Sequence, residues 1–152
     1  MEKEAVKEIL EEGLGKYRYL LDVEKEEFDG VIKALSEKWY EYANEKGWKE
    51  KELRNAIEFL KREIDEFMGF DLLFDDRYTY CLPVSEIEYV ELFTPENYEK
   101  IKKIKELGVD KTRTIKICNL PEEWDRLIEM AESGLTPDEI DLLMNLDWSE
   151  EY

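Results

Sequence analysis

Residues 28–67 read FDGVIKALSEKWYEYANEKGWKEKELRNAIEFLKREIDEF, and this stretch decides the fold expected for the N-terminal part of the chain. Its apolar side chains recur every three or four residues, which is typical of amphipathic helices. One run consists of Phe28, Val31, Ile32, Leu35, Trp39 and Tyr42, and the next of Leu53, Ala56, Ile57, Leu60, Ile64 and Phe67. Because Gly47 separates the runs, we predict two long helices in an antiparallel hairpin, with both apolar stripes buried.

Upstream of this hairpin, the spacing of apolar residues predicts a shorter helix from Lys3 to Glu12. Gly13 and Gly15 follow it, and glycine commonly marks the end of a helix. We therefore expect residues 1–68 to be helical, apart from breaks at Gly13–Gly15 and at Gly47.

Beyond Phe67 the apolar period changes from helical spacing to alternation. The segments 70–74 and 78–82 alternate, with Asp75 and Asp76 between them as a plausible turn. The segment 87–93 is rich in β-branched and aromatic residues, which favour strands, and the segment 112–120 alternates again. Between those two, Thr94 and Pro95 predict the start of a helix that ends at Gly108. We expect a small, mostly antiparallel sheet of about four strands.

The C-terminal part predicts two further helices. The first starts at Pro121 and ends at Gly134, and the second follows a capping box at Thr136–Glu139. The second should bury Ile140, Leu143 and Met144. Residues 130–140 resemble the corner of a helix-turn-helix motif, but the would-be recognition helix opens with acidic residues, so we favour a packed αα-corner.

Together these patterns predict an α+β fold: an N-terminal helical hairpin packed with the small sheet, followed by the C-terminal αα-corner. No linker or repeat divides the chain, so we expect a single domain over residues 1–152. Within it, residues 1–68 form the helical part, residues 69–120 the β-rich part with one helix, and residues 121–152 the acidic helical part.

The composition excludes several classes of function. The 152 residues include 40 acidic and 22 basic side chains, and the net charge of −18 opposes direct binding to nucleic acid or an anionic membrane. Histidine is absent, which excludes a Ser-His-Asp or Cys-His site within the chain. We expect no enzyme activity, no cofactor and no metal centre. Cys81 and Cys118 are interpreted as reduced core residues, and the lack of an apolar signal or span predicts a cytoplasmic protein, or a host-cytoplasmic one if viral.

The charge is unevenly distributed along the chain. Residues 1–68 carry −6, residues 69–99 carry −7, residues 100–120 carry +5 and residues 121–152 carry −10. We call the positive stretch from Lys100 to Lys116 the basic island. It could pair with the neighbouring acidic segments, remain solvated, or contact an acidic patch on a partner or second subunit.

Two other acidic groups are weaker candidates. Asp71, Asp75 and Asp76 lie close in sequence, but their spacing matches no EF-hand loop. Glu86 and Glu88 could pair as glycosidase carboxylates, although such pairs are common in so acidic a chain.

The strongest candidate site is a row of four carboxylates in the first C-terminal helix, which we call the acidic row: Glu122, Asp125, Glu129 and Glu132. Spacings of three, four and three residues place them on one helix face, roughly 5 Å apart along the axis. A second set of acids extends this candidate partner-binding surface: Asp138, Asp141, Asp147, Glu150 and Glu151. A secondary acidic surface would comprise Asp75, Asp76, Glu86, Glu88 and Glu91.

Such a density of negative charge approaches that of a phosphate backbone. We therefore hypothesise a small acidic inhibitor that binds a basic, nucleic-acid-binding protein. It is similar in general character to viral or plasmid-borne nucleic-acid mimics that block restriction or CRISPR nucleases, and a nuclease immunity protein is a related version. The alternative is an acidic adaptor or chaperone that docks through an apolar helical face, with the charge serving only solubility.

Overall fold

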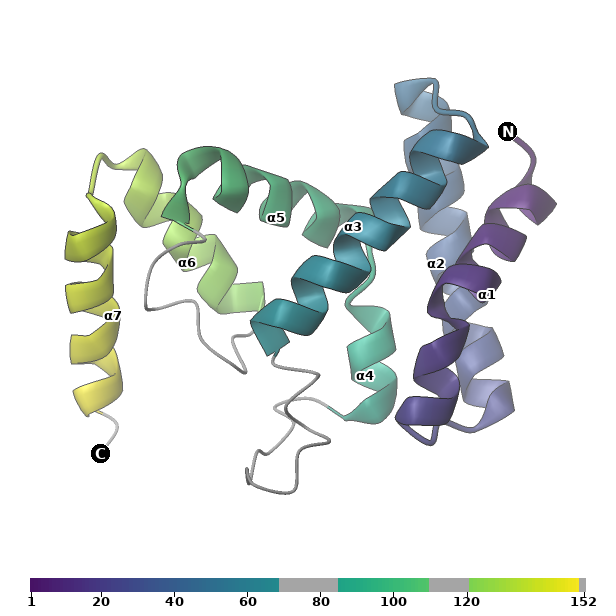
Figure 1. Cartoon of the computed structure of the whole chain (residues 1–152), viewed down its shortest axis with the longest axis horizontal. Coiled ribbons are helices and arrows are strands. Elements are labelled where there is room, and N and C mark those ends of the chain that lie inside the picture. The colour runs from purple at the N-terminus through teal and green to yellow at the C-terminus, as the bar shows by residue number, and fades with distance from the viewer. Residues whose placement is uncertain (69–84, 110–120, 151–152) are drawn as a thin grey trace. The chain divides into compact units, whose positions relative to one another are not determined.

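The computed structural model describes residues 1–68, 85–109 and 121–150, and within these ranges every regular element is a helix (Figure 1). The helices are α1 (Lys3–Leu20), α2 (Lys25–Lys46), α3 (Glu50–Met68), α4 (Glu86–Glu91), α5 (Pro95–Leu107), α6 (Pro121–Glu132) and α7 (Pro137–Glu150). The predicted α+β fold with a four-stranded sheet is therefore wrong, because the described chain is helical and contains no strand. The predicted strands at 70–74, 78–82 and 112–120 lie outside the described residues.

The predicted strand at 87–93 is replaced by α4, and a side-chain cap at Ser85 explains the error. The backbone N–H of Glu88 donates to the Ser85 hydroxyl at 3.3 Å, and that hydroxyl donates to the Glu88 carboxylate at 3.0 Å. The first bond satisfies a backbone N–H at the start of the helix and the second holds the capping hydroxyl in place, which favours a helix where β-branched residues alone would not. Tyr89 and Val90 are fully buried on α4, so tertiary packing stabilises this short helix in addition to the cap.

The first helix is longer than predicted, because α1 continues through Gly13 and Gly15 to Leu20. Gly13 instead permits close packing: a Cβ atom there would lie 2.8 Å from Cγ2 of Ile57 on α3. The chain leaves α1 through Asp22, a non-glycine residue with φ of 53°.

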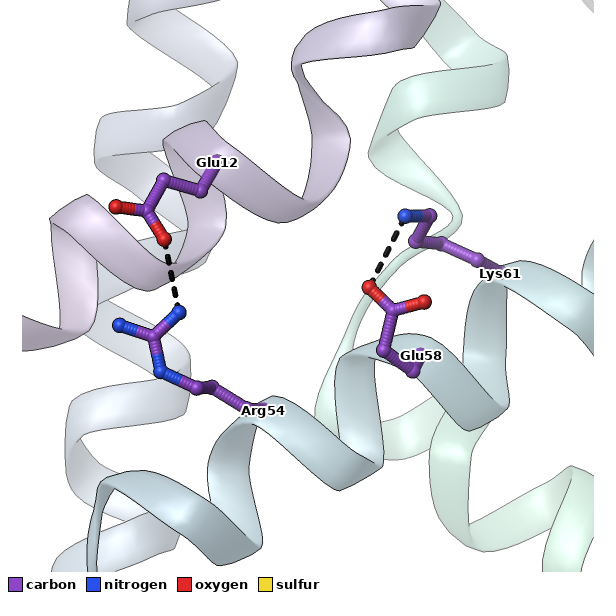
Figure 2. Close-up of polar contacts among 4 residues, drawn as sticks. All are labelled: Glu12, Arg54, Glu58 and Lys61. Atoms are coloured by element: carbon purple, nitrogen blue, oxygen red, sulfur yellow. Dashed lines mark hydrogen bonds and ion pairs between the residues drawn. The ribbon is translucent and has the colours of Figure 1, made fainter.

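An ion pair joins the same two helices on their exposed side. The Arg54 guanidinium donates to the Glu12 carboxylate at 2.8 Å (Figure 2). That hydrogen bond is the chief reason why the pKa of Arg54 is raised above its usual value, with the nearby charges of Glu12 and Glu50 adding to it. Further along α3, Lys61 pairs with Glu58 at 3.1 Å, one turn away (Figure 2).

The helix α2 contains the first predicted apolar stripe and ends, as predicted, at Gly47, which adopts a left-handed φ of 68°. Both predicted long helices are present. The antiparallel partner that lies alongside α2, however, is α1 (Figure 1). The helix α2 also packs against α4. The α1–α2 pair is closed by the short connection at residues 21–24.

The core between these helices is aromatic. The indole N–H of Trp39 donates to the carbonyl of Phe93 at 2.9 Å, so the buried ring on α2 has its polar atom satisfied. The centroid of the Tyr17 ring on α1 lies 5.6 Å from the ring centroid of Tyr89 and 5.1 Å from that of Phe93. Most of the first predicted stripe is buried here, as expected: Phe28, Ile32, Leu35 and Trp39.

The chain divides into two compact units, which are described separately. The first contains Met1–Ile64 and Val84–Tyr98, and the second contains Asp65–Pro83 and Glu99–Tyr152. The start of α5 is capped as predicted, because the N–H of Asn97 donates to the Thr94 hydroxyl at 3.1 Å.

In the second unit, α6 and α7 form the predicted corner. Gly134 ends α6 with φ of 92°, and Thr136 and Glu139 exchange reciprocal capping bonds of 3.2 Å. Ile140 is buried as predicted, but Leu143 is 39% exposed, which corrects the expectation that it belongs to the core.

Candidate protein-interaction surface

The acidic row lies on one exposed face of α6. Its residues are all exposed, whereas Trp124 and Leu127 on the same helix are fully buried. The local cause is the helical period, which turns the apolar residues inward and leaves the carboxylates in solvent. Four carboxylates therefore share the face that sequence spacing assigned to them: Glu122, Asp125, Glu129 and Glu132.

Two carboxylates of the row are paired with lysines of the basic island. Lys100 Nζ lies 3.1 Å from Asp125 Oδ2, and Lys103 Nζ lies 3.5 Å from Glu132 Oε1. The Asp125 and Glu132 side chains remain 57% and 53% exposed. Pairing within the chain thus accounts for these two lysines, while Lys111, Arg113 and Lys116 lie outside the described residues.

The other two carboxylates of the row differ from these. Within the described part of the chain, neither Glu122 nor Glu129 makes a side-chain ion pair or hydrogen bond. Along the row, carboxylates that carry uncompensated charge therefore alternate with carboxylates that are paired with a lysine.

The second set of acids continues onto α7. Asp138 is exposed, whereas Asp141 is half-buried. The side chains of Asp147, Glu150 and Glu151 lie outside the described residues, so the extension towards the C-terminus stays a prediction.

Sequence reasoning missed an apolar feature between these acids. Leu142 is 62% exposed and adjoins the half-exposed Leu143. The sequence analysis placed Leu143 on the buried face of this helix and did not single out Leu142, because apolar residues of a helix are normally turned towards the core.

The secondary acidic surface is brought together only in part. Glu86, Glu88 and Glu91 are exposed on α4, where Glu88 also serves the cap at Ser85. Asp75 and Asp76 lie outside the described residues. Glu91 borders a groove between α2 and α4 that sequence reasoning did not anticipate.

The described residues include no cluster of three or more histidine, cysteine, aspartate or glutamate side chains able to hold a metal ion. The aspartates 71, 75 and 76 lie outside this part of the chain. No helix in the described ranges is long and apolar enough to cross a membrane. The chain matches no known protein family, no curated protein and no solved structure.

Proposed function

We propose that this protein is a small acidic inhibitor that binds a basic, nucleic-acid-binding protein through the α6–α7 corner. One observation carries the proposal: all four carboxylates of the acidic row are exposed on a single helix face, within a segment of net charge −10. Like charges on one helix face repel one another, and such an arrangement is relieved when a basic surface covers it.

The two lysine pairs are compatible with this role. Exposed ion pairs contribute only about 0–1 kcal/mol, so arginines of a partner could replace Lys100 and Lys103 at little cost. Until then, Glu122 and Glu129 supply the uncompensated charge that would steer a basic partner towards the row.

The exposed leucines of α7 supply apolar surface for an interface, which the carboxylates do not. A stable interface usually has an apolar centre surrounded by polar residues. Leu142 and Leu143 could form that centre, with Asp138 at its edge and the acidic row beyond the corner. A partner should therefore combine basic side chains with an apolar pocket, as a nucleic-acid-binding groove lined by aromatic residues does.

Blocking such a groove would give the protein an inhibitory role. A nuclease of a restriction or CRISPR system, or a toxin nuclease, would be a suitable target because each binds a polyanion through lysine and arginine. The adaptor alternative would use the apolar faces of the N-terminal helices, many of whose residues are buried, and it would not need the acidic row.

The test compares two variants that change the net charge equally. E122K/E129K reverses the two uncompensated members of the row and leaves both lysine pairs intact. E41K/E45K reverses two exposed acids on α2 and serves as the control. Each immobilised protein is exposed to lysate of the source cell and washed at physiological ionic strength, and the bound proteins are then identified.

We expect the wild type and E41K/E45K to retain a basic protein that E122K/E129K loses, and duplex DNA to displace it. The isolated partner should lose at least tenfold in affinity for E122K/E129K. Equal retention by all three proteins would refute the role of the row. A bound protein that duplex DNA cannot displace would contradict nucleic-acid mimicry.

A further inference from the structure

A groove of about 670 Å³ lies between α2 and α4 in the first unit. Its apolar lining is formed by Val31, Ala34 and Leu35 of α2 and Ile87 of α4. Leu35 is buried, while Val31 and Ile87 are half-buried and Ala34 is exposed, so apolar surface remains open to solvent there.

Gly30 lies in this groove, and the packing of the described helices does not require a glycine there. It sits inside α2 without a positive φ, and among the described residues no atom lies within 4 Å of a Cβ atom placed there. Glycine within a helix lowers stability relative to alanine, because the glycine backbone loses more conformational freedom on folding. The open space above Gly30 therefore has no role in the packing of this unit.

Gly15 shows that such space alone does not define a site. A Cβ atom at Gly15 would also meet nothing, but the depression around it is lined mainly by charged residues of both signs. At Gly30, by contrast, the next helical turn presents Ala34, and the two small residues adjoin the apolar lining. Small residues one turn apart allow the backbone of a second helix to approach closely.

The charges at the edge of the groove select the occupant. Three carboxylates, Glu26, Glu27 and Glu91, line it together with one base, Lys38. Glu26 and Glu27 lie at the N-terminal end of α2, and Lys38 lies about 16 Å further along the helix axis. An acidic segment would be repelled by most of this edge, whereas a basic one would be attracted.

We propose that the α2–α4 groove binds a basic amphipathic helix of a partner protein. Its apolar face lies on Gly30, Ala34 and Ile87, and its lysines or arginines meet the three carboxylates. A segment of about 11 residues, or three turns, spans the distance from Glu27 to Lys38. This inference does not depend on the acidic row, because the groove is formed entirely by the first unit.

The probe is a fluorescein-labelled peptide of about 14 residues, with leucines at helical spacing and lysines on the opposite face. Its scrambled form has the same composition but no apolar face, and so controls for attraction to the net charge. Binding to the full chain is measured by fluorescence anisotropy at physiological ionic strength.

Two matched pairs of variants test the site. G30L fills the groove where space is open, while G15L adds the same side chain at another open helical glycine. E26K/E27K reverses the edge of the groove, while E41K/E45K makes the same charge change elsewhere on α2. Circular dichroism and urea unfolding confirm that each variant remains folded.

We expect G30L and E26K/E27K each to weaken peptide binding at least tenfold, and G15L, E41K/E45K and E122K/E129K each to change it less than twofold. The scrambled peptide should bind the wild type at least tenfold more weakly. Failure of the peptide to bind, or equal binding to G30L and the wild type, would overturn the proposal. Self-association of the wild type that G30L abolishes would also overturn it, by assigning the groove to a second copy.

Discussion

Gly13 and Gly15 lie in the same helix, two residues apart, yet their surroundings give them opposite physical roles. Gly13 faces Ile57 at a distance that leaves no room for a methyl group, while Gly15 faces open space. Both looked like helix ends because glycine carries the same statistical signal in either setting. What distinguishes them is the neighbouring helix α3, which sequence spacing alone cannot place.

This difference predicts opposite effects of alanine at the two positions. In G13A the new methyl group clashes with buried, β-branched Ile57, whose rotamer is restricted in a helix. Overpacking costs about 1–3 kcal/mol and outweighs the gain in helix propensity, so the free energy of unfolding should fall by about 1 kcal/mol. G15A should raise it by up to about 1 kcal/mol. Urea unfolding followed by circular dichroism measures both, and a stabilised G13A would contradict the close packing of α1 and α3.

Trp39 gives a second prediction at this scale. W39F removes the indole donor to the Phe93 carbonyl and leaves a cavity in a fully buried site. We expect a loss of about 2–4 kcal/mol in the free energy of unfolding. W48F is the control, because Trp48 is only half-buried, and it should cost less than half as much. Equal losses in the two variants would contradict a special role for the buried hydrogen bond.

At the scale of elements, the sequence predicted best where caps and long periodic runs agree. The ends of α2, α5 and α6 at Gly47, Gly108 and Gly134 were predicted, and all three glycines adopt positive φ. The helix α4 was missed because six residues are too few to show a helical period, and β-branched and aromatic side chains favour strands in isolation. The signal that could have revealed it is the capping-box sequence pattern Ser85-Glu86-Ile87-Glu88.

The cap of α4 can be tested directly. S85A removes the side chain that accepts from the Glu88 N–H, and should lower the free energy of unfolding by about 1 kcal/mol. S85T keeps a hydroxyl that accepts from the Glu88 N–H and donates to the Glu88 carboxylate, so it should recover most of the loss. Thermal unfolding of the three proteins gives the comparison, and a neutral S85A would show that packing alone holds α4.

For the acidic row, too, the sequence predicted the positions within one helix but not the contacts with its neighbour. Spacing placed four carboxylates on one face of α6, but it could not show that Lys100 and Lys103 of α5 lie against two of them. Such pairing depends on how two helices pack, which local periodicity does not determine. The exposed leucines of α7 and the α2–α4 groove escaped prediction for the same reason.

For the whole molecule, the net charge of −18 should set how stability responds to salt. Charges of one sign repel more strongly in the compact state than in the unfolded chain. Exposed ion pairs such as Lys7–Glu11, Lys25–Asp29 and Arg54–Glu12 add little individually, so screening should remove more repulsion than attraction. Raising NaCl from about 0.02 M to about 0.5 M shortens the Debye length several-fold, and should increase the free energy of unfolding by about 1 kcal/mol or more.

A variant with the same fold and less charge separates self-repulsion from any general effect of salt. Combining E41K/E45K with E122K/E129K replaces four of the 40 acids by lysine and lowers the magnitude of the net charge by eight. Its stability should depend less steeply on NaCl than that of the wild type, when both are measured by urea unfolding. A decrease in wild-type stability with salt would mean that ion pairs such as Arg54–Glu12 outweigh repulsion. The acidic row would then not be the strained surface that a basic partner relieves.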